Sequence, residues 1–153
     1  EVRDWWDKFD PRWAGIRLEA LELLKKEQRL EQIVRLIGPD ALPDTERLVL
    51  SVAEMIKNGF LQQNAFDEVD VYSVPEKQIL ILQLMIGFYK RALGVIKQGC
   101  PLLKINTLTC KEEIIRIKTS VPNDKLEMIK EIENHFENEF GNLERLYRKV
   151  ETI

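Results

Sequence analysis

Apolar residues recur every three or four positions along almost the whole chain, and this spacing restricts the fold more than any other feature. Charged residues fill the positions between them in the first such series, as in a helix that buries one face. Glu27 is its one polar break. The pattern predicts a long helix that Gly38-Pro39 ends. The apolar positions of this first series are Trp13, Ile16, Ala20, Leu23, Leu30, Val34 and Ile37.

A second helix is predicted from Pro43 to about Gly59, shortly after the first helix ends. Two helices joined by so few residues form an antiparallel hairpin. We therefore expect the tip of this hairpin, Gly38 to Glu46, to project from the rest of the fold. The stretch from Phe60 to Val74 mixes polar and apolar residues without a helical period and is predicted to be irregular.

A third helix is predicted from Pro75 to about Gln98. It is apolar on nearly all sides between Ile79 and Phe88, which is typical of a helix buried in the middle of a bundle. Gly99 and Pro101 end it.

Two further helices follow. Thr109 and Glu112 have the spacing of a capping box, which predicts a short fourth helix over about 111–120. The last helix has its own apolar series. These positions predict an all-α fold, a helical bundle of about five helices with a projecting helix-turn-helix hairpin. The members of the last series are Leu126, Ile129, Ile132, Phe136, Phe140, Leu143, Tyr147 and Val150.

Composition excludes several classes of function. The chain has 153 residues, which fits one domain, and a net charge of -3 without a basic stripe, so we expect no nucleic-acid partner. Its longest apolar runs are much shorter than the roughly 20 residues that span a bilayer, so we expect no direct membrane insertion. Cys100 and Cys110, the two cysteines, favour a reducing compartment over a disulfide framework.

No catalytic motif is present in the sequence. The 7 glycines form no phosphate-binding loop, and no nucleophile elbow or metalloprotease motif occurs. His135 lies on a polar stretch and is predicted to be a surface histidine, so we expect no metal site. The start, Glu1-Val2-Arg3, has no initiating Met and is typical of a cut inside a longer protein. These residues alone predict only an all-helical domain.

Two segments carry a resemblance to a known family. Residues 36–48, LIGPDALPDTERL, resemble the helix–turn–helix of the catalytic subunits of rotary ATPases, in which a loop touches the central shaft. Residues 60–66, FLQQNAF, resemble the segment that lines the adenine pocket of the same subunits. Their sequence resembles the form of this segment in A-type and V-type ATPases. The chain is thus similar to the C-terminal domain of the catalytic A subunit of archaeal A-type and V-type rotary ATPases. From Gly99 on, only the general helical plan matches.

The resemblance implies an adenine-binding role for three residues. Phe66 would pack against the base, Phe60 would form a second wall, and Gln63 would hydrogen-bond the edge of the base. An aromatic ring stacked on a base contributes roughly 1–3 kcal/mol of binding free energy. The alternative is that both phenylalanines are core residues and that Gln63 is an exposed loop side chain.

The resemblance also implies a contact between the hairpin tip and the central stalk. Steric push should matter more there than charge, because an exposed ion pair is worth only about 0–1 kcal/mol. The alternative is a solvated turn whose acids lie at a helix N-terminus. The residues of the expected contact are Gly38, Pro39, Asp40, Ala41, Leu42, Pro43, Asp44 and Glu46, and Thr45 lies in the same tip.

At the level of the whole protein, the resemblance implies an ion-translocating ATPase or ATP synthase that moves protons or sodium. The full subunit would bind ATP or ADP with Mg²⁺ on a domain outside this chain, and it would alternate with the non-catalytic B subunit in a hexameric ring. The head would be cytoplasmic and peripheral to the membrane. Residues 1–10 would end the linker from that domain, and 11–153 would form the bundle, with a hinge near Asp10–Trp13.

Two expectations complete the interpretation. The chain alone, without a phosphate-binding loop, is predicted to bind no nucleotide cofactor and to have no ATPase activity. The alternative function is a stand-alone helical protein–protein interaction module that uses the last helix, with its series from Phe136 to Val150, as a coiled-coil partner.

Overall fold

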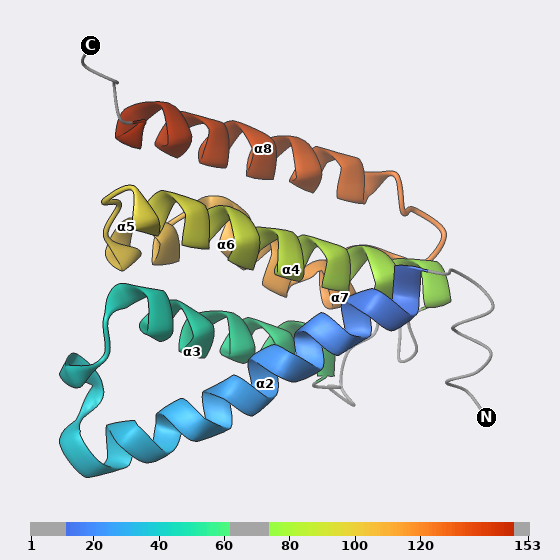
Figure 1. The fold of residues 1–153 in the computed structure, drawn as a ribbon. Coiled ribbons are helices and arrows are strands. Elements are labelled where there is room, and N and C mark those ends of the chain that lie inside the picture. The colour runs from blue at the N-terminus through green and yellow to red at the C-terminus, as the bar shows by residue number, and fades with distance from the viewer. Residues whose placement is uncertain (1–11, 62–73, 149–153) are drawn as a thin grey trace.

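The computed structural model describes residues 12–61 and 74–148, and these residues are helical wherever they are regular (Figure 1). The predicted all-α fold is confirmed. In chain order the elements are α2 (Arg12–Ile37), the 3₁₀ turn η1 (Pro39–Ala41), α3 (Asp44–Ile56), the π-helical turn η2 (Lys57–Leu61), α4 (Pro75–Lys97), α5 (Leu102–Asn106), α6 (Thr109–Ile115), α7 (Ile117–Ser120) and α8 (Met128–Tyr147).

Helix α4 forms the middle of the bundle, as its apolarity on nearly all sides predicts. In Figure 1 it runs between α8 on one side and the α2–α3 pair on the other, and α6 and α7 also contact it. Met85 and Phe88 are fully buried. Among the described helices, α4 alone is long and apolar enough to cross a bilayer. Its position in the bundle accounts for that composition, because most of its apolar side chains are buried against neighbouring helices.

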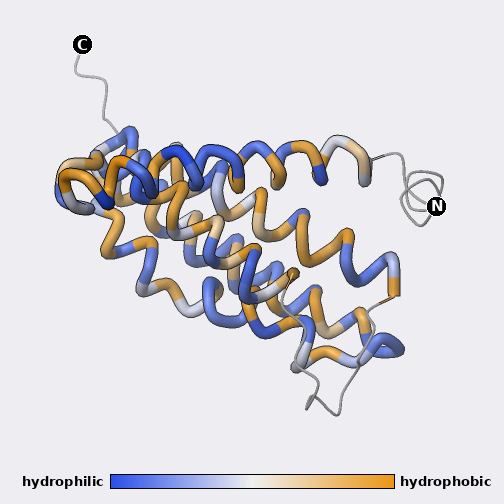
Figure 2. The backbone as a smooth tube through the Cα atoms, turned by 90° about the horizontal axis from the view of Figure 1, so that it is seen from below, coloured by the Kyte–Doolittle hydropathy of each residue, from blue (hydrophilic) through white to orange (hydrophobic). Residues whose placement is uncertain are grey.

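Helix α8 packs its apolar face on α4. The rings of Phe88 and Phe140 meet edge to face, with centroids 5.2 Å apart, and Phe136 lies beside Phe140 at 5.0 Å. Figure 2 shows polar and apolar residues alternating along the helices of the bundle. Arg91 of α4 closes the contact with ion pairs to Glu144 at 2.6 Å and to Glu137 at 2.9 Å. The apolar series of the last helix is therefore used inside the bundle; Val150 lies outside the described residues.

Helices α2 and α3 form the predicted hairpin. Leu48 and Val52 of α3 are fully buried. Glu27, the polar break in the first series, is also buried and pairs with Lys57 Nζ at 2.5 Å, so a charge–charge contact joins α2 to η2. Gly38 ends α2 with φ 87°, a left-handed conformation that favours glycine.

The region between α4 and α8 differs from the prediction. The single helix expected over 111–120 is two helices, α6 and α7, separated at Arg116, and α5 was not predicted. The capping box was also wrong. Thr109 and the N–H of Cys110 bond to the carboxylate of Glu139, which lies 30 residues from Thr109 in the sequence. A carboxylate from α8 thus satisfies the free N–H groups at the start of α6.

Candidate functional site

Two regions of the structure bear on the predicted sites: the surroundings of Phe60 and the turn between α2 and α3. Phe60 and Leu61 lie in η2, so the prediction of an irregular segment was wrong for these two residues, and 62–73 lie outside the described residues. Lys118 Nζ donates to the backbone oxygen of Phe60 at 2.9 Å. Gly59, the preceding residue, lies so close to α4 and α6 that an added Cβ would be 3.0 Å from the backbone of Ile115. These contacts fix the position of Phe60.

The Phe60 ring borders a cavity. It lies 6.3 Å from the ring of Trp13, centroid to centroid, with the planes tilted by 47°. Both rings line an apolar cavity of about 200 Å³ between α2, η2 and α4, called the α2–η2 cavity below. Phe60 is half-buried and packs against the core, so it combines features of both alternatives, the core aromatic and the binding wall. The other lining residues are Arg17, Ala20, Leu21, Leu24, Ile56, Leu61 and Leu82.

Arg17 brings the one charged group to the described lining of this cavity. Its Nε atom is buried and has no hydrogen-bond partner within the part of the chain that the structure describes. A buried donor left without a partner costs about 1–3 kcal/mol of folding free energy. Sequence reasoning missed Arg17, because a single arginine on a charged helix face carries no signal.

Phe66 and Gln63 lie outside the described residues, so their adenine-binding roles stay predictions. Among the described residues, no three His, Cys, Asp or Glu side chains come together as ligands of a metal ion. His135 is exposed, as predicted, and its Nδ1 lies 2.9 Å from a carboxylate oxygen of Glu113.

The predicted stalk contact consists of two structurally different parts. Pro39, Asp40 and Ala41 are exposed in η1, and Gly38 is partly exposed. Leu42, by contrast, is buried, so its side chain offers no surface here. Our expectation that the whole tip projects was therefore wrong for this residue.

The start of α3 is fastened to the body of the bundle. Asp44 accepts a hydrogen bond from the N–H of Leu102 at 3.0 Å and lies 3.5 Å from Arg47. Its carboxylate thus caps α5 and is already engaged. Pro43 is exposed, and Thr45 and Glu46 are partly exposed beside it. The contact with the central stalk stays a prediction for all of these residues.

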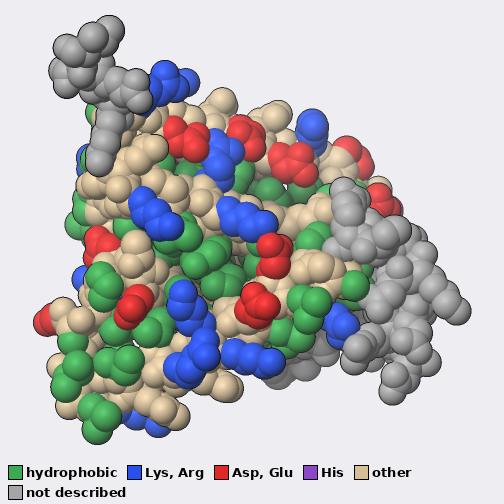
Figure 3. Space-filling view, viewed as in Figure 1, with side chains coloured by type: hydrophobic (Ala, Val, Ile, Leu, Met, Phe, Trp, Pro, Cys, Tyr) green, Lys and Arg blue, Asp and Glu red, His purple; other side chains and the backbone are tan. Residues whose placement is uncertain are grey.

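An exposed apolar surface lies beside the turn, at the end of α2. Leu36 is 84% exposed and Ile37 is 68% exposed, and Ile33 lies one turn earlier. We had expected Ile37 to be a core position, and this was wrong, because α3 and α2 diverge toward η1 and leave the last turn of α2 uncovered (Figure 1). Hydrophobic side chains gather at this end of the molecule in Figure 3.

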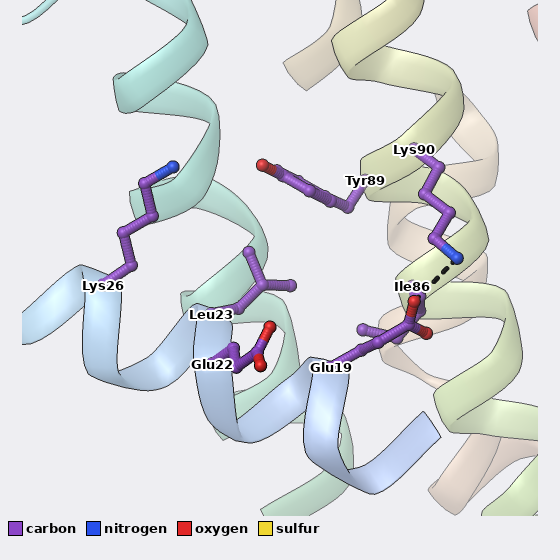
Figure 4. A pocket seen from close by; sticks show the side chains of 7 residues that line it. All are labelled: Glu19, Glu22, Leu23, Lys26, Ile86, Tyr89 and Lys90. Carbon is purple, nitrogen blue, oxygen red and sulfur yellow. Dashed lines mark ion pairs between the residues drawn. The ribbon is translucent and has the colours of Figure 1, made fainter. Parts of the chain in front are cut away.

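A second groove lies between α2 and α4. Figure 4 shows its polar lining, in which Glu19 and Lys90 form an ion pair of 2.8 Å. Burial raises the pKa of Tyr89 above its ordinary value. Lys26 and Glu22 complete a balanced set of two basic and two acidic groups around about 210 Å³. Because these charges cancel, the groove favours neither an anionic nor a cationic ligand.

Comparison with known proteins gives consistent matches. Residues 3–106 match the family described as the C-terminal domain of V and A type ATP synthase. The A subunit of the A-type ATP synthase from Pyrococcus abyssi is 49% identical over 118 residues, 76% of this chain and 12% of the relative. The A subunits from Thermococcus sibiricus and Methanopyrus kandleri are 42% and 43% identical, covering 97% and 94% of the chain. The chain spans 12% to 24% of the length of these relatives.

Proposed function

The chain belongs to the family of C-terminal domains of V and A type ATP synthases, and from this premise we propose that it serves the catalytic subunit of a rotary ATP synthase or ATPase. Its relatives are named as the A subunits of A-type ATP synthases. In this proposal the domain contributes the adenine side of the ATP site and transmits torque to the central stalk.

The observation that carries the proposal is the course of α3. This helix runs from the exposed turn at Asp44 to η2, where Phe60 borders the cavity. Its 13 residues span about 20 Å, and most of its apolar residues are fully buried. A close-packed helix moves as a unit. A nucleotide that shifts Phe60 would therefore displace the turn as well, together with the end of α2.

At the nucleotide end, we assign Phe66 and Phe60 to the two faces of the adenine ring and Gln63 to its edge. The half-buried ring of Phe60 beside an apolar cavity supports this assignment. ATP or ADP and Mg²⁺ would be held chiefly by parts of the subunit outside this chain, which has no phosphate-binding loop. For this reason we expect no nucleotide hydrolysis by the 153-residue chain alone.

At the other end, the turn and the last turn of α2 would press on the central stalk. The exposed side chains of Leu36 and Ile37 favour an apolar, steric contact. Asp44 is engaged with Leu102 and Arg47, which leaves Asp40 as the exposed acid of the turn. This supports steric push, rather than charge attraction, as the way in which torque is transmitted to the central stalk.

The same family membership supports a proposal for the assembly. We propose that the full-length protein alternates with a non-catalytic B subunit in a hexameric ring, in a head peripheral to the membrane, and that rotation drives or is driven by proton or sodium transport. Residues 1–10 would end the linker from the nucleotide-binding domain, and 11–153 would form the helical bundle. A hinge near Asp10–Trp13 would allow this bundle to tilt.

The alternative of a stand-alone interaction module loses its basis in the structure. It required the apolar series of α8 to face a partner. Phe136 and Phe140 are instead buried against α4. The family match also accounts for the segments that the alternative left unexplained.

The test of this proposal is Phe66→Ala in the full-length protein. Loss of a stacking ring should weaken MgATP binding roughly 5- to 160-fold, with little change in melting temperature. Phe136→Ala is the matched control, because it removes a core ring far along the chain and should lower the melting temperature while leaving the affinity unchanged. A fall in melting temperature with unaltered affinity in Phe66→Ala would reject the adenine role.

A further inference from the structure

We infer that Arg17 is a positioning residue for the base: the α2–η2 cavity takes a neutral aromatic heterocycle, and the Nε–H of Arg17 donates a hydrogen bond to one of its ring nitrogens. This inference rests on the proposed function only in naming the heterocycle as the adenine of ATP or ADP. It is carried by the size of the cavity, by its lining and by one donor without a partner among the described residues.

The volume of the cavity restricts what it holds. At about 200 Å³ it is smaller than the roughly 300–1,000 Å³ of pockets that enclose a whole drug-sized ligand. It accommodates one ring system and leaves the rest of a ligand outside. A nucleotide whose phosphates are bound elsewhere meets this requirement.

The lining selects a neutral, flat group. Trp13 and Phe60 present aromatic surfaces, and the other lining side chains except Arg17 are aliphatic. An anion placed there loses most of its hydration, and a single guanidinium rarely compensates for that loss. An aromatic ring instead gains stacking free energy on the same walls.

Arg17 supplies the directional contact. Its Nε–H is buried in a cavity wall without a partner among the described residues, which is the condition under which one added acceptor is most effective. Adenine offers three ring nitrogens, N1, N3 and N7, each of which accepts one hydrogen bond. Since Nε carries a single hydrogen, one of these nitrogens is enough to satisfy it.

The experiment pairs a protein change with changes in the base. Equilibrium binding to the full-length protein is measured for MgATP and for its 1-deaza, 3-deaza and 7-deaza analogues, in which one ring nitrogen is replaced by carbon. Arg17→Gln should weaken MgATP binding about tenfold. One deaza analogue should bind wild type about tenfold more weakly than MgATP and should lose little more in Arg17→Gln, because the same hydrogen bond is already absent.

Arg29→Gln is the matched control. It removes the same charge from an exposed position about three turns further along α2 and should leave all four affinities unchanged. The melting temperature of Arg17→Gln should equal or exceed that of wild type, since an unpaired buried donor is removed.

The outcomes separate this inference from the proposed function. Equal losses for every analogue in Arg17→Gln, or no loss at all, would overturn the role of Arg17 even if Phe66→Ala weakens binding. Coupling between Arg17 and one ring nitrogen would support it even if Phe66→Ala binds MgATP as wild type does. A wild-type protein that binds no MgATP would overturn both.

Discussion

At the scale of single residues, Gly59 has the least room for a side chain among the glycines of the chain. An alanine there would place its Cβ 2.6 Å from Met85 Cε and 3.0 Å from the backbone of Ile115. Gly59→Ala should therefore reduce the free energy of unfolding by about 1–3 kcal/mol through overpacking. Gly94→Ala, on exposed α4 surface with no atom within 4 Å of the new Cβ, should raise it by about 0.5–1 kcal/mol. Urea denaturation of both variants measures the difference; a stabilised Gly59→Ala would show that η2 is not packed as described.

The contact between His135, the single histidine of the chain, and Glu113 should contribute to stability in a way that depends on pH. Its hydrogen bond with Glu113 raises the pKa of the imidazole above its ordinary value. The stabilisation of the fold by this pair is therefore complete below the pKa of about 6.5 that histidine has in the unfolded chain. It is lost as the pH rises through the pKa of His135 in the folded protein. An NMR titration should show a lower His135 pKa in Glu113→Gln than in wild type. Equal values in the two proteins would mean that the pair does not form in solution.

Residue-scale contacts also decide which site predictions were possible. The FLQQNAF segment is a local pattern, so the position of Phe60 at a candidate site was accessible from the sequence. Arg17 was not, because its importance depends on Trp13 and on Phe60, which is distant in the sequence. The hydrogen bond of Asp44 was inaccessible for the same reason, since the N–H that donates to its carboxylate belongs to Leu102, 58 residues further along the chain.

At the scale of elements, Arg91 adds polar contacts to the apolar packing of α4 against α8. Arg91 donates through Nε and Nη2 to both carboxylate oxygens of Glu144, and its guanidinium lies 5.6 Å from the ring centroid of Phe136. A lysine cannot reproduce this planar, two-pronged geometry. Arg91→Lys should therefore destabilise the fold by roughly 1 kcal/mol in urea denaturation.

Arg116→Lys is the control for that substitution, because Arg116 forms an exposed pair with Glu112 at 3.6 Å on a single helix segment. Its free energy of unfolding should change little. If the two variants were equally stable, the Arg91 contact would contribute no more than a surface ion pair.

Elements with a long apolar period were predictable, and those fixed by distant partners were not. The periodicity predicted α2, α3, α4 and α8 because a helix that buries one face repeats its apolar residues locally. The short helices α5, α6 and α7 lack enough turns for a period. The start of α6 is set by Glu139 of α8 rather than by its own Glu112, and no local pattern encodes such a contact.

At the scale of the whole molecule, one rigid body must join the nucleotide end to the turn if the domain is to transmit torque. Helix α3 provides the connection between η2 and η1, and its burial against α2 and α4 keeps it from bending independently. In that case, the exposed apolar side chains at the end of α2 would form the contact surface. Leu36 is the most exposed of the described large hydrophobic residues and is the best reporter of this surface.

The most direct measurement is photo-crosslinking from position 36 in the assembled, full-length complex. A photo-reactive phenylalanine analogue at Leu36 should form an adduct with the central stalk, in a yield that differs between ATP and ADP. The same analogue at Leu146, an exposed leucine on α8, should give no stalk adduct. Adducts from position 36 that remain within the ring, or a stalk adduct whose yield ignores the nucleotide, would contradict the coupling of base and turn through α3.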